Sequence, residues 1–132
     1  MAERLSFDTS FLIDIQKEKR SNRRGRAHGF LEDHSEAAML VSAVAIGEFA
    51  EGFSAAHGTI LRKMLAALEI LEIDGETALL YGVNARRLRE TGRLIGGNDL
   101  WIGCSALRHG VPLVTRDAEH FRRITGLRVL EY

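Results

Sequence analysis

Four acidic residues lie where predicted strands end or predicted helices begin. Asp8 closes the apolar run LSFD, and Glu48 follows the run MLVSAVAIG. Asp99 opens the segment DLWIGCSALRHG, and Asp117 follows PLVTR. In a parallel α/β sheet such positions converge on one edge, which is where ligands bind. Four carboxylates brought together repel one another unless protons or a divalent cation neutralise them, so the sequence predicts an acidic metal site.

The elements that position these acids are predicted from short apolar runs. They indicate five strands, at 4–8, 39–42, 69–73, 112–115 and 127–131, separated by segments long enough for helices. Strands that alternate with helices favour a mostly parallel sheet, because parallel strands need a crossover connection. We expect the α/β fold class, as a three-layer α/β/α sandwich around a mostly parallel twisted sheet. The 132 residues contain no repeat or linker, which predicts a single domain over 1–132.

Helical periodicity is clear over 98–109. Apolar or small residues recur there at i, i+3, i+4 and i+7, namely Leu100, Gly103, Cys104 and Leu107. The neighbouring face is also mostly apolar, so this helix is expected to be buried with Asp99 in its first turn. An aspartate there can also serve only to complement the helix dipole. Cys104 is expected to be a small buried hydrophobic residue rather than a nucleophile.

The side-chain direction of Glu48 stays open. In the helix expected after Ser42, the strong apolar stripe lies on the face opposite Glu48. Periodicity is therefore compatible with a solvated glutamate and with one that points into a site. Its position soon after a strand end favours the second alternative.

Overall charge is uninformative, but its distribution is uneven. The chain has 18 basic and 18 acidic residues, so a net charge of zero gives no sign of nucleic-acid binding. Residues 17–26, KEKRSNRRGR, hold six basic side chains and one acidic one. Such a patch could bind a polyanion, or it could be a solvated, mobile loop after the first helix.

The expected location is cytoplasmic, with no membrane association. The single cysteine, Cys104, rules out an intramolecular disulfide and suits a reducing compartment. Apolar stretches are shorter than the ~18 residues that a membrane span needs, and no signal-peptide pattern is recognised at the N-terminus.

Several common chemistries are disfavoured. The sequence has no P-loop, no GxGxxG after a strand, no HExxH and no Gly-x-Ser-x-Gly elbow. The histidines at 28, 34, 57, 109 and 120 lack zinc-finger spacing to any cysteine pair. A catalytic site in which carboxylates bind a divalent metal ion remains the favoured interpretation.

Three segments together resemble the signature regions of the PIN-domain family. They are FDTSFLIDI at 7–15, VSAVAIGEFAEG at 41–52 and IGGNDLWIGCSALRHGVPLVTRDAEHFRRITGLRVLEY at 95–132. Among PIN domains, the similarity is to the VapC-type toxin ribonucleases of bacterial and archaeal toxin–antitoxin pairs. The motifs keep their order and spacing across the whole chain, and this combination is specific although each motif alone is weak.

The resemblance implies a set of site residues. The catalytic and metal-binding quartet would be Asp8, Glu48, Asp99 and Asp117, accompanied by the hydroxyl residues Thr9, Ser10 and Thr115. Arg116 is a candidate phosphate contact, as are Arg23, Arg24 and Arg93. Asp117 could instead be a helix N-cap.

The resemblance also implies an activity and partners. The activity would be Mg²⁺-dependent endoribonucleolytic cleavage, with Mn²⁺ able to substitute, in which metal-activated water leaves 5′-phosphate and 3′-hydroxyl ends. One or two metals could bind. The expected partners are an RNA substrate, a cognate VapB-like antitoxin that covers the active-site groove, and a second copy of the chain in a homodimer.

Two other functions compete with this one. The chain could be a non-catalytic PIN-like module that binds RNA or a protein. It could also be a phosphatase or phospho-acceptor domain with Asp8 as the nucleophile, although Asp8-Thr9-Ser10 lacks the second acid that such enzymes use.

Structural roles are expected for several other polar and aromatic residues. Asp14 and Glu51 should be solvated helix residues near the site, and Asp74 should be an N-cap. Trp101 is expected in the core or in an interface.

Overall fold

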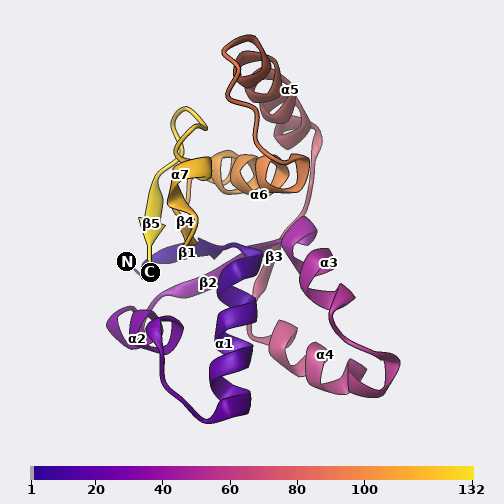
Figure 1. The fold of residues 1–132 in the computed structure, drawn as a ribbon, viewed down its shortest axis with the longest axis vertical. Helices are drawn as coiled ribbons and strands as arrows, with labels where there is room; N and C mark the ends of the chain where they lie inside the picture. The colour runs from indigo at the N-terminus through magenta and orange to yellow at the C-terminus, as the bar shows by residue number, and fades with distance from the viewer. Residues whose placement is uncertain (1) are drawn as a thin grey trace.

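A sheet of five parallel strands forms the centre of the protein. The computed structural model describes residues 2–132, with strand order β3-β2-β1-β4-β5 and parallel pairing throughout (Figure 1). The strands are β1 (Arg4–Phe7), β2 (Ala38–Ser42), β3 (Glu69–Leu71), β4 (Leu113–Thr115) and β5 (Val129–Glu131). All five predicted strands are confirmed, with bounds within a few residues of those expected.

Helices cover both faces of the sheet. They are α1 (Thr9–Ser21), α2 (Arg26–Asp33), α3 (Ala43–Glu51), the 3₁₀ turn η1 (Ala55–His57), α4 (Gly58–Ala66), α5 (Gly75–Glu90), α6 (Gly97–Arg108) and α7 (Ala118–Phe121). In Figure 1, α5, α6 and α7 lie on one side of the sheet, and α1, α2 and α4 lie on the other. Helix α3 packs against both α1 and α6. The predicted three-layer α/β/α sandwich is confirmed.

Strand register brings distant segments together at one edge. β1 lies between β2 and β4, and Phe7 pairs with Val114. Asp8, directly after β1, therefore lies beside Thr115, the last residue of β4. All strands point the same way, so the segments after β1, β2 and β4 meet at their carboxyl ends.

Helix α6 is buried as its sequence predicts. Leu100, Ile102 and Cys104 are each at most 1% exposed. Gly103 also faces the interior, where an added Cβ would collide with the side chain of Ile124. The missing side chain lets the α7–β5 segment pack directly on α6. Burial raises the pKa of the Cys104 thiol to about 11, so it behaves as the small hydrophobic residue that was expected.

The expectation of a loop over 17–26 is wrong for most of that segment. Helix α1 continues to Ser21 and α2 begins at Arg26, which leaves only 22–25 as a turn. The carboxylate of Glu18 accepts the backbone N–H groups of Gly25, Ala27 and His28, and so caps α2 from the preceding helix.

The predicted N-cap role of Asp74 is confirmed, because its carboxylate accepts the Thr77 N–H at the start of α5. Trp101 stacks on Tyr81 with ring centroids 4.0 Å apart. No helix within residues 2–132 has the length and apolar character needed to cross a membrane.

Candidate metal centre and active site

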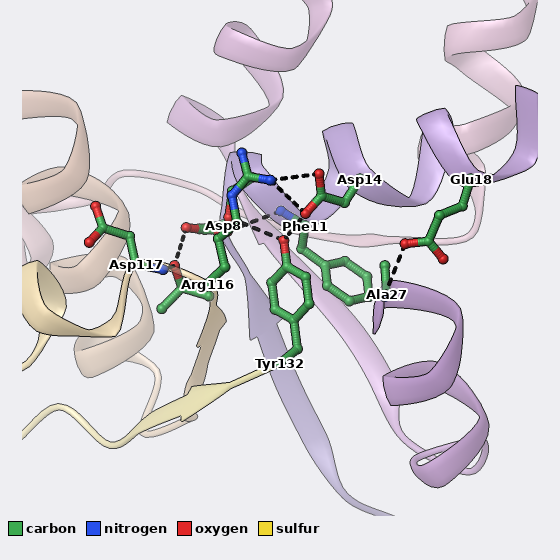
Figure 2. A network of polar contacts seen from close by, with 10 residues as sticks. Asp8, Phe11, Asp14, Glu18, Ala27, Arg116, Asp117 and Tyr132 are labelled. Atoms are coloured by element: carbon green, nitrogen blue, oxygen red, sulfur yellow. Dashed lines mark hydrogen bonds and ion pairs between the residues drawn. The ribbon is translucent and has the colours of Figure 1, made fainter. Parts of the chain in front are cut away.

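Asp8 is the most firmly held acid of the site. It follows β1 and caps α1, where Oδ1 accepts the Phe11 N–H at 3.2 Å and the Ser10 hydroxyl at 2.6 Å. Oδ2 accepts the Thr115 hydroxyl at 2.5 Å, from the neighbouring strand β4 (Figure 2). The residue is only 5% exposed, so three donors orient a carboxylate that has little contact with solvent.

This burial changes the acidity of Asp8. It raises the pKa of the carboxyl above its usual range, although the hydrogen bonds and the positive charge of Arg116 act in the opposite direction. Burial therefore favours the protonated form of Asp8 more than the surrounding donors favour the charged form.

Glu48 points toward the other acids rather than into free solvent. Its Oε1 accepts the Thr9 hydroxyl at 2.6 Å, and its Oε2 accepts the Asn98 amide at 3.1 Å. Thr9 begins α1 and Asn98 lies in the first turn of α6, so α3 directs this half-buried carboxylate between the two helices. Helical periodicity left open whether Glu48 is solvated or points into a site, and these contacts show that it points into the site.

Asp99 and Asp117 meet a histidine that the sequence interpretation missed. One donor atom from each of Asp99, Asp117 and His120 lies within 4.8 Å of the other two. Nδ1 of His120 is 2.8 Å from Oδ2 of Asp117. The only sequence signal was the i, i+3 spacing of Asp117 and His120, which places two side chains on one helix face.

The proposed N-cap role of Asp117 does not appear in the structure. Asp117 occupies the N-cap position of α7, but its side chain makes no capping hydrogen bond. Its carboxylate is directed to His120, and its N–H donates to the Thr115 hydroxyl at 3.0 Å. Thr115, fully buried, thus connects Asp8 with Asp117 through one oxygen.

The charges of the acids converge on Asp99. Burial raises the pKa of its carboxyl, and the negative charges of Glu48, Asp8 and Asp117 raise it further, while His120 lowers it. Three of the four acids predicted from sequence therefore lie close enough to the fourth, Asp99, to act on it electrostatically.

This donor set fits a hard divalent cation. Carboxylate oxygens are the ligands that Mg²⁺ and Mn²⁺ prefer, and an imidazole nitrogen is compatible with Mn²⁺. Asp99, Asp117 and His120 form the candidate ligand group, and the oriented oxygens of Asp8 and Glu48 lie beside it. A bound cation would remove the repulsion that raises the pKa of Asp99.

Asp14 differs from its expected role. Both of its carboxylate oxygens accept from Arg116, and Oδ2 also accepts the Tyr132 hydroxyl. The expectation of a solvated residue is wrong for Asp14, because the first half of α1 lies beside the end of β4, where Arg116 follows. Glu51 is exposed as expected.

The chain belongs to the PIN domain family, whose model matches residues 6–127. Within that family it is similar to Ribonuclease VapC1 of Methanocaldococcus jannaschii, with 32% identity over 127 residues, or 94% of this chain and 85% of the relative. Ribonuclease VapC1 of Haemophilus influenzae strain R2866 is 41% identical over 61 residues, or 46% of each chain.

Solved structures confirm the fold. DNA-bound VapBC from Salmonella typhimurium gives a TM-score of 0.83 at 23% identity, covering 98% of both chains. VapBC2 from Rickettsia felis, bound to a DNA fragment from its promoter, gives 0.80 at 22% identity, covering 97% of this chain and 98% of the other.

Proposed function

We propose that this protein is a Mg²⁺-dependent endoribonuclease, the toxin of a toxin–antitoxin pair, which hydrolyses RNA phosphodiester bonds. The observation that carries the proposal is the convergence of Asp8, Glu48, Asp99 and Asp117, where the pKa of Asp99 is raised by burial and by its acidic neighbours. Such a site favours a cation at the carboxyl edge of the sheet. The relatives named Ribonuclease VapC support RNA as the substrate class.

In this proposal Asp99, Asp117 and His120 hold Mg²⁺, for which Mn²⁺ can substitute, and Asp8 and Glu48 complete the site. The cation supplies Lewis-acid polarisation of the scissile phosphodiester and activation of a water. Ser10 and Thr115 hold the Asp8 carboxylate in place. Such outer partners affect activity because they fix the direction of the ligand oxygens.

Glu48 is proposed to orient the attacking water. Thr9 and Asn98 each donate to one of its oxygens, which leaves further lone pairs free to accept a proton. Since water rather than the 2′-hydroxyl is the nucleophile, no 2′,3′-cyclic phosphate should form. With the 3′-oxygen as the leaving group, the products should carry 5′-phosphate and 3′-hydroxyl ends.

The proposed substrate is single-stranded RNA, whose bases and backbone are accessible in a way that an A-form duplex does not allow. Arg116 is half exposed beside the acids and is the proposed phosphate contact. The basic residues at 17–26 could add a weaker, salt-dependent attraction. The cytoplasm is the proposed place of action.

An antitoxin is the proposed protein partner. Support comes from structural neighbours that are VapBC complexes, among them VapBC-1 from nontypeable Haemophilus influenzae, with a TM-score of 0.74 at 26% identity over 97% of both chains. We further propose a homodimer as the assembly that binds the antitoxin.

The proposal is tested by cleavage of a cellular RNA pool with antitoxin-free protein, in Mg²⁺ and in chelator, with new ends mapped by 5′-phosphate ligation. Asp99→Ala should abolish the cuts, because it removes the acid on which the other charges converge. Asp33→Ala, at an exposed aspartate in α2, is the matched control and should cut normally.

Three outcomes would contradict the proposed nuclease mechanism. Cuts that persist in Asp99→Ala or that end in a 2′,3′-cyclic phosphate would exclude this mechanism. RNA binding without any metal-dependent cut would favour the non-catalytic binding module.

A further inference from the structure

Three segments far apart in the chain meet around the carboxylate of Asp14. Nη1 of Arg116 donates to both of its oxygens, at 2.8 and 2.9 Å. The hydroxyl of Tyr132 donates to Oδ2 of Asp14 at 2.7 Å. Figure 2 shows Asp14 between the guanidinium and the phenol, near the side chain of Asp8. The ion pair is therefore one part of a network that also includes a second, independent donor.

Tyr132 is well fixed for this role. Its ring packs edge-to-face on Phe11, with centroids 5.0 Å apart. Burial raises the pKa of the phenol, so the hydroxyl stays protonated and donates. Its oxygen is also 3.4 Å from the Ser10 hydroxyl, which holds Asp8. The Asp14 side chain is only 19% exposed, so its carboxylate is a defined acceptor.

Only one nitrogen of the Arg116 guanidinium, Nη1, donates hydrogen bonds to protein within residues 2–132. The side chain is 52% exposed and follows Thr115, directly before Asp117. Its positive charge lowers the pKa of Asp8, which places it within electrostatic reach of the acidic centre. Nε and Nη2 keep their donors in the rigid geometry of the guanidinium fork.

We propose that Asp14 and Tyr132 are positioning residues that hold Arg116 so that its free donors bind an RNA phosphate beside the acidic centre. The inference rests on the proposed function, since it assumes RNA as the ligand. If the ion pair were purely structural, loss of the Tyr132 hydroxyl would leave RNA binding unchanged, and an exposed pair adds little to stability. The two roles differ in whether Tyr132 affects RNA binding through Arg116.

The first measurement is binding of a short single-stranded RNA over a range of salt concentrations, in the Asp99→Ala background so that the RNA stays intact. Arg116→Ala should weaken binding by about tenfold and lower the salt slope by roughly 0.7, as expected for one lost phosphate contact on a single strand. Arg116→Gln repeats the test if the alanine variant does not fold.

Tyr132→Phe removes only the hydroxyl and keeps the ring against Phe11. It should weaken binding by about threefold, because the guanidinium is less well oriented. The matched control is Tyr81→Phe, at the other tyrosine of the chain, which keeps its stacking on Trp101 and should bind as the parent does. Melting curves confirm that each variant is folded at the assay temperature.

The decisive comparison is Tyr132→Phe in the presence of Arg116→Ala. If Tyr132 acts through Arg116, the double variant should bind no more weakly than Arg116→Ala alone, since residues acting as one unit are not additive. An equal loss in both backgrounds, or unchanged binding in Arg116→Ala, overturns the inference.

Cleavage by the protein without these substitutions separates this inference from the proposed function. If Mg²⁺-dependent cleavage is normal but RNA affinity is unchanged by the substitutions at Arg116 and Tyr132, only the positioning role is rejected. The expected binding pattern without cleavage rejects the nuclease alone. The absence of both RNA binding and RNA cleavage rejects both proposals.

Discussion

Asp99 is the residue at which the charges of the site meet. Burial and three neighbouring carboxylates raise its pKa, and one histidine opposes them. The folded state therefore binds a proton on Asp99 more tightly than the unfolded state, for which the usual carboxyl pKa is 3.8. Folding stability contributed by this group falls as pH rises from that value through the raised pKa of the folded protein.

Asp99→Asn should therefore stabilise the metal-free protein at neutral pH. We expect its melting temperature in chelator at pH 7 to exceed that of the unmodified protein by a few degrees, since about 1 kcal/mol corresponds to roughly 4 °C at this size. The difference in melting temperature should shrink as pH falls below about 4, where Asp99 is protonated in both the folded and the unfolded protein. Asp33→Asn should change little, and a lower melting temperature for Asp99→Asn at pH 7 would contradict the repulsion.

Thr115 should affect activity more than its size suggests. Its hydroxyl donates to Asp8 and accepts the N–H of Asp117, so Thr115→Val removes one of the three donors to the Asp8 carboxylate and the acceptor of the Asp117 N–H. We expect RNA cleavage to fall by about 10- to 100-fold, as for other residues that orient metal ligands. Thr125→Val, at an exposed threonine, is the control for the same chemical change. Unaltered cleavage by Thr115→Val would show that Asp8 needs no orientation from β4.

At the scale of elements, one glutamate connects α1 with α2. Gly25, the N-cap residue of α2, has no side chain to cap the helix, and Glu18 takes that role by accepting three backbone N–H groups. Its Oε1 is also 2.6 Å from Nδ1 of His28. Burial opposes the charge, but these hydrogen bonds lower the pKa of Glu18 to about 2.

Glu18→Ala should lower the free energy of unfolding by about 2 kcal/mol at pH 7, the upper range for loss of a helix cap. Because the folded pKa is lowered, this stability is present above the usual value of 4.5 and is lost as pH falls toward about 2. Urea unfolding at several pH values measures it. Glu36→Ala, at an exposed glutamate, should have little effect, and an equal loss there would argue against a specific cap.

The same interaction explains why the loop alternative for 17–26 was wrong. A run of basic residues over 17–26 has no local signal for helix in place of loop. Glu18 reaches the start of α2 only after the chain has turned at 22–25, so the cap depends on tertiary geometry. By contrast, α6 was predicted nearly to the residue, because its apolar periodicity is a local property.

At the scale of the whole molecule, strand order creates the site. β1 lies between β2 and β4, and the segments that follow them carry Asp8, Glu48 and Asp117 to one edge. Helix α6 brings Asp99 to the same edge by packing on α3. An even balance of charge over the chain thus conceals a strongly acidic region.

Binding of Mg²⁺ should stabilise the whole protein. A ligand that binds only the folded state adds about 2.7 kcal/mol at 100 times its dissociation constant, so the melting temperature should rise with Mg²⁺ concentration. Asp99→Asn should reduce this response, because it replaces a charged candidate ligand with a neutral amide. Scanning calorimetry with and without chelator measures it, and an identical rise in both proteins would exclude Asp99 as a ligand.

The sequence alone determined the five strands and their parallel arrangement, because these follow from local apolar patterns. It also predicted the four acids as site residues, from their positions near strand ends and helix starts. Tertiary structure decided the direction of Glu48, the entry of His120 into the site and the network of Asp14, Arg116 and Tyr132. These contacts join residues up to 118 positions apart. Such contacts depend on which strands are neighbours and on where each side chain points, and neither property is encoded in local periodicity.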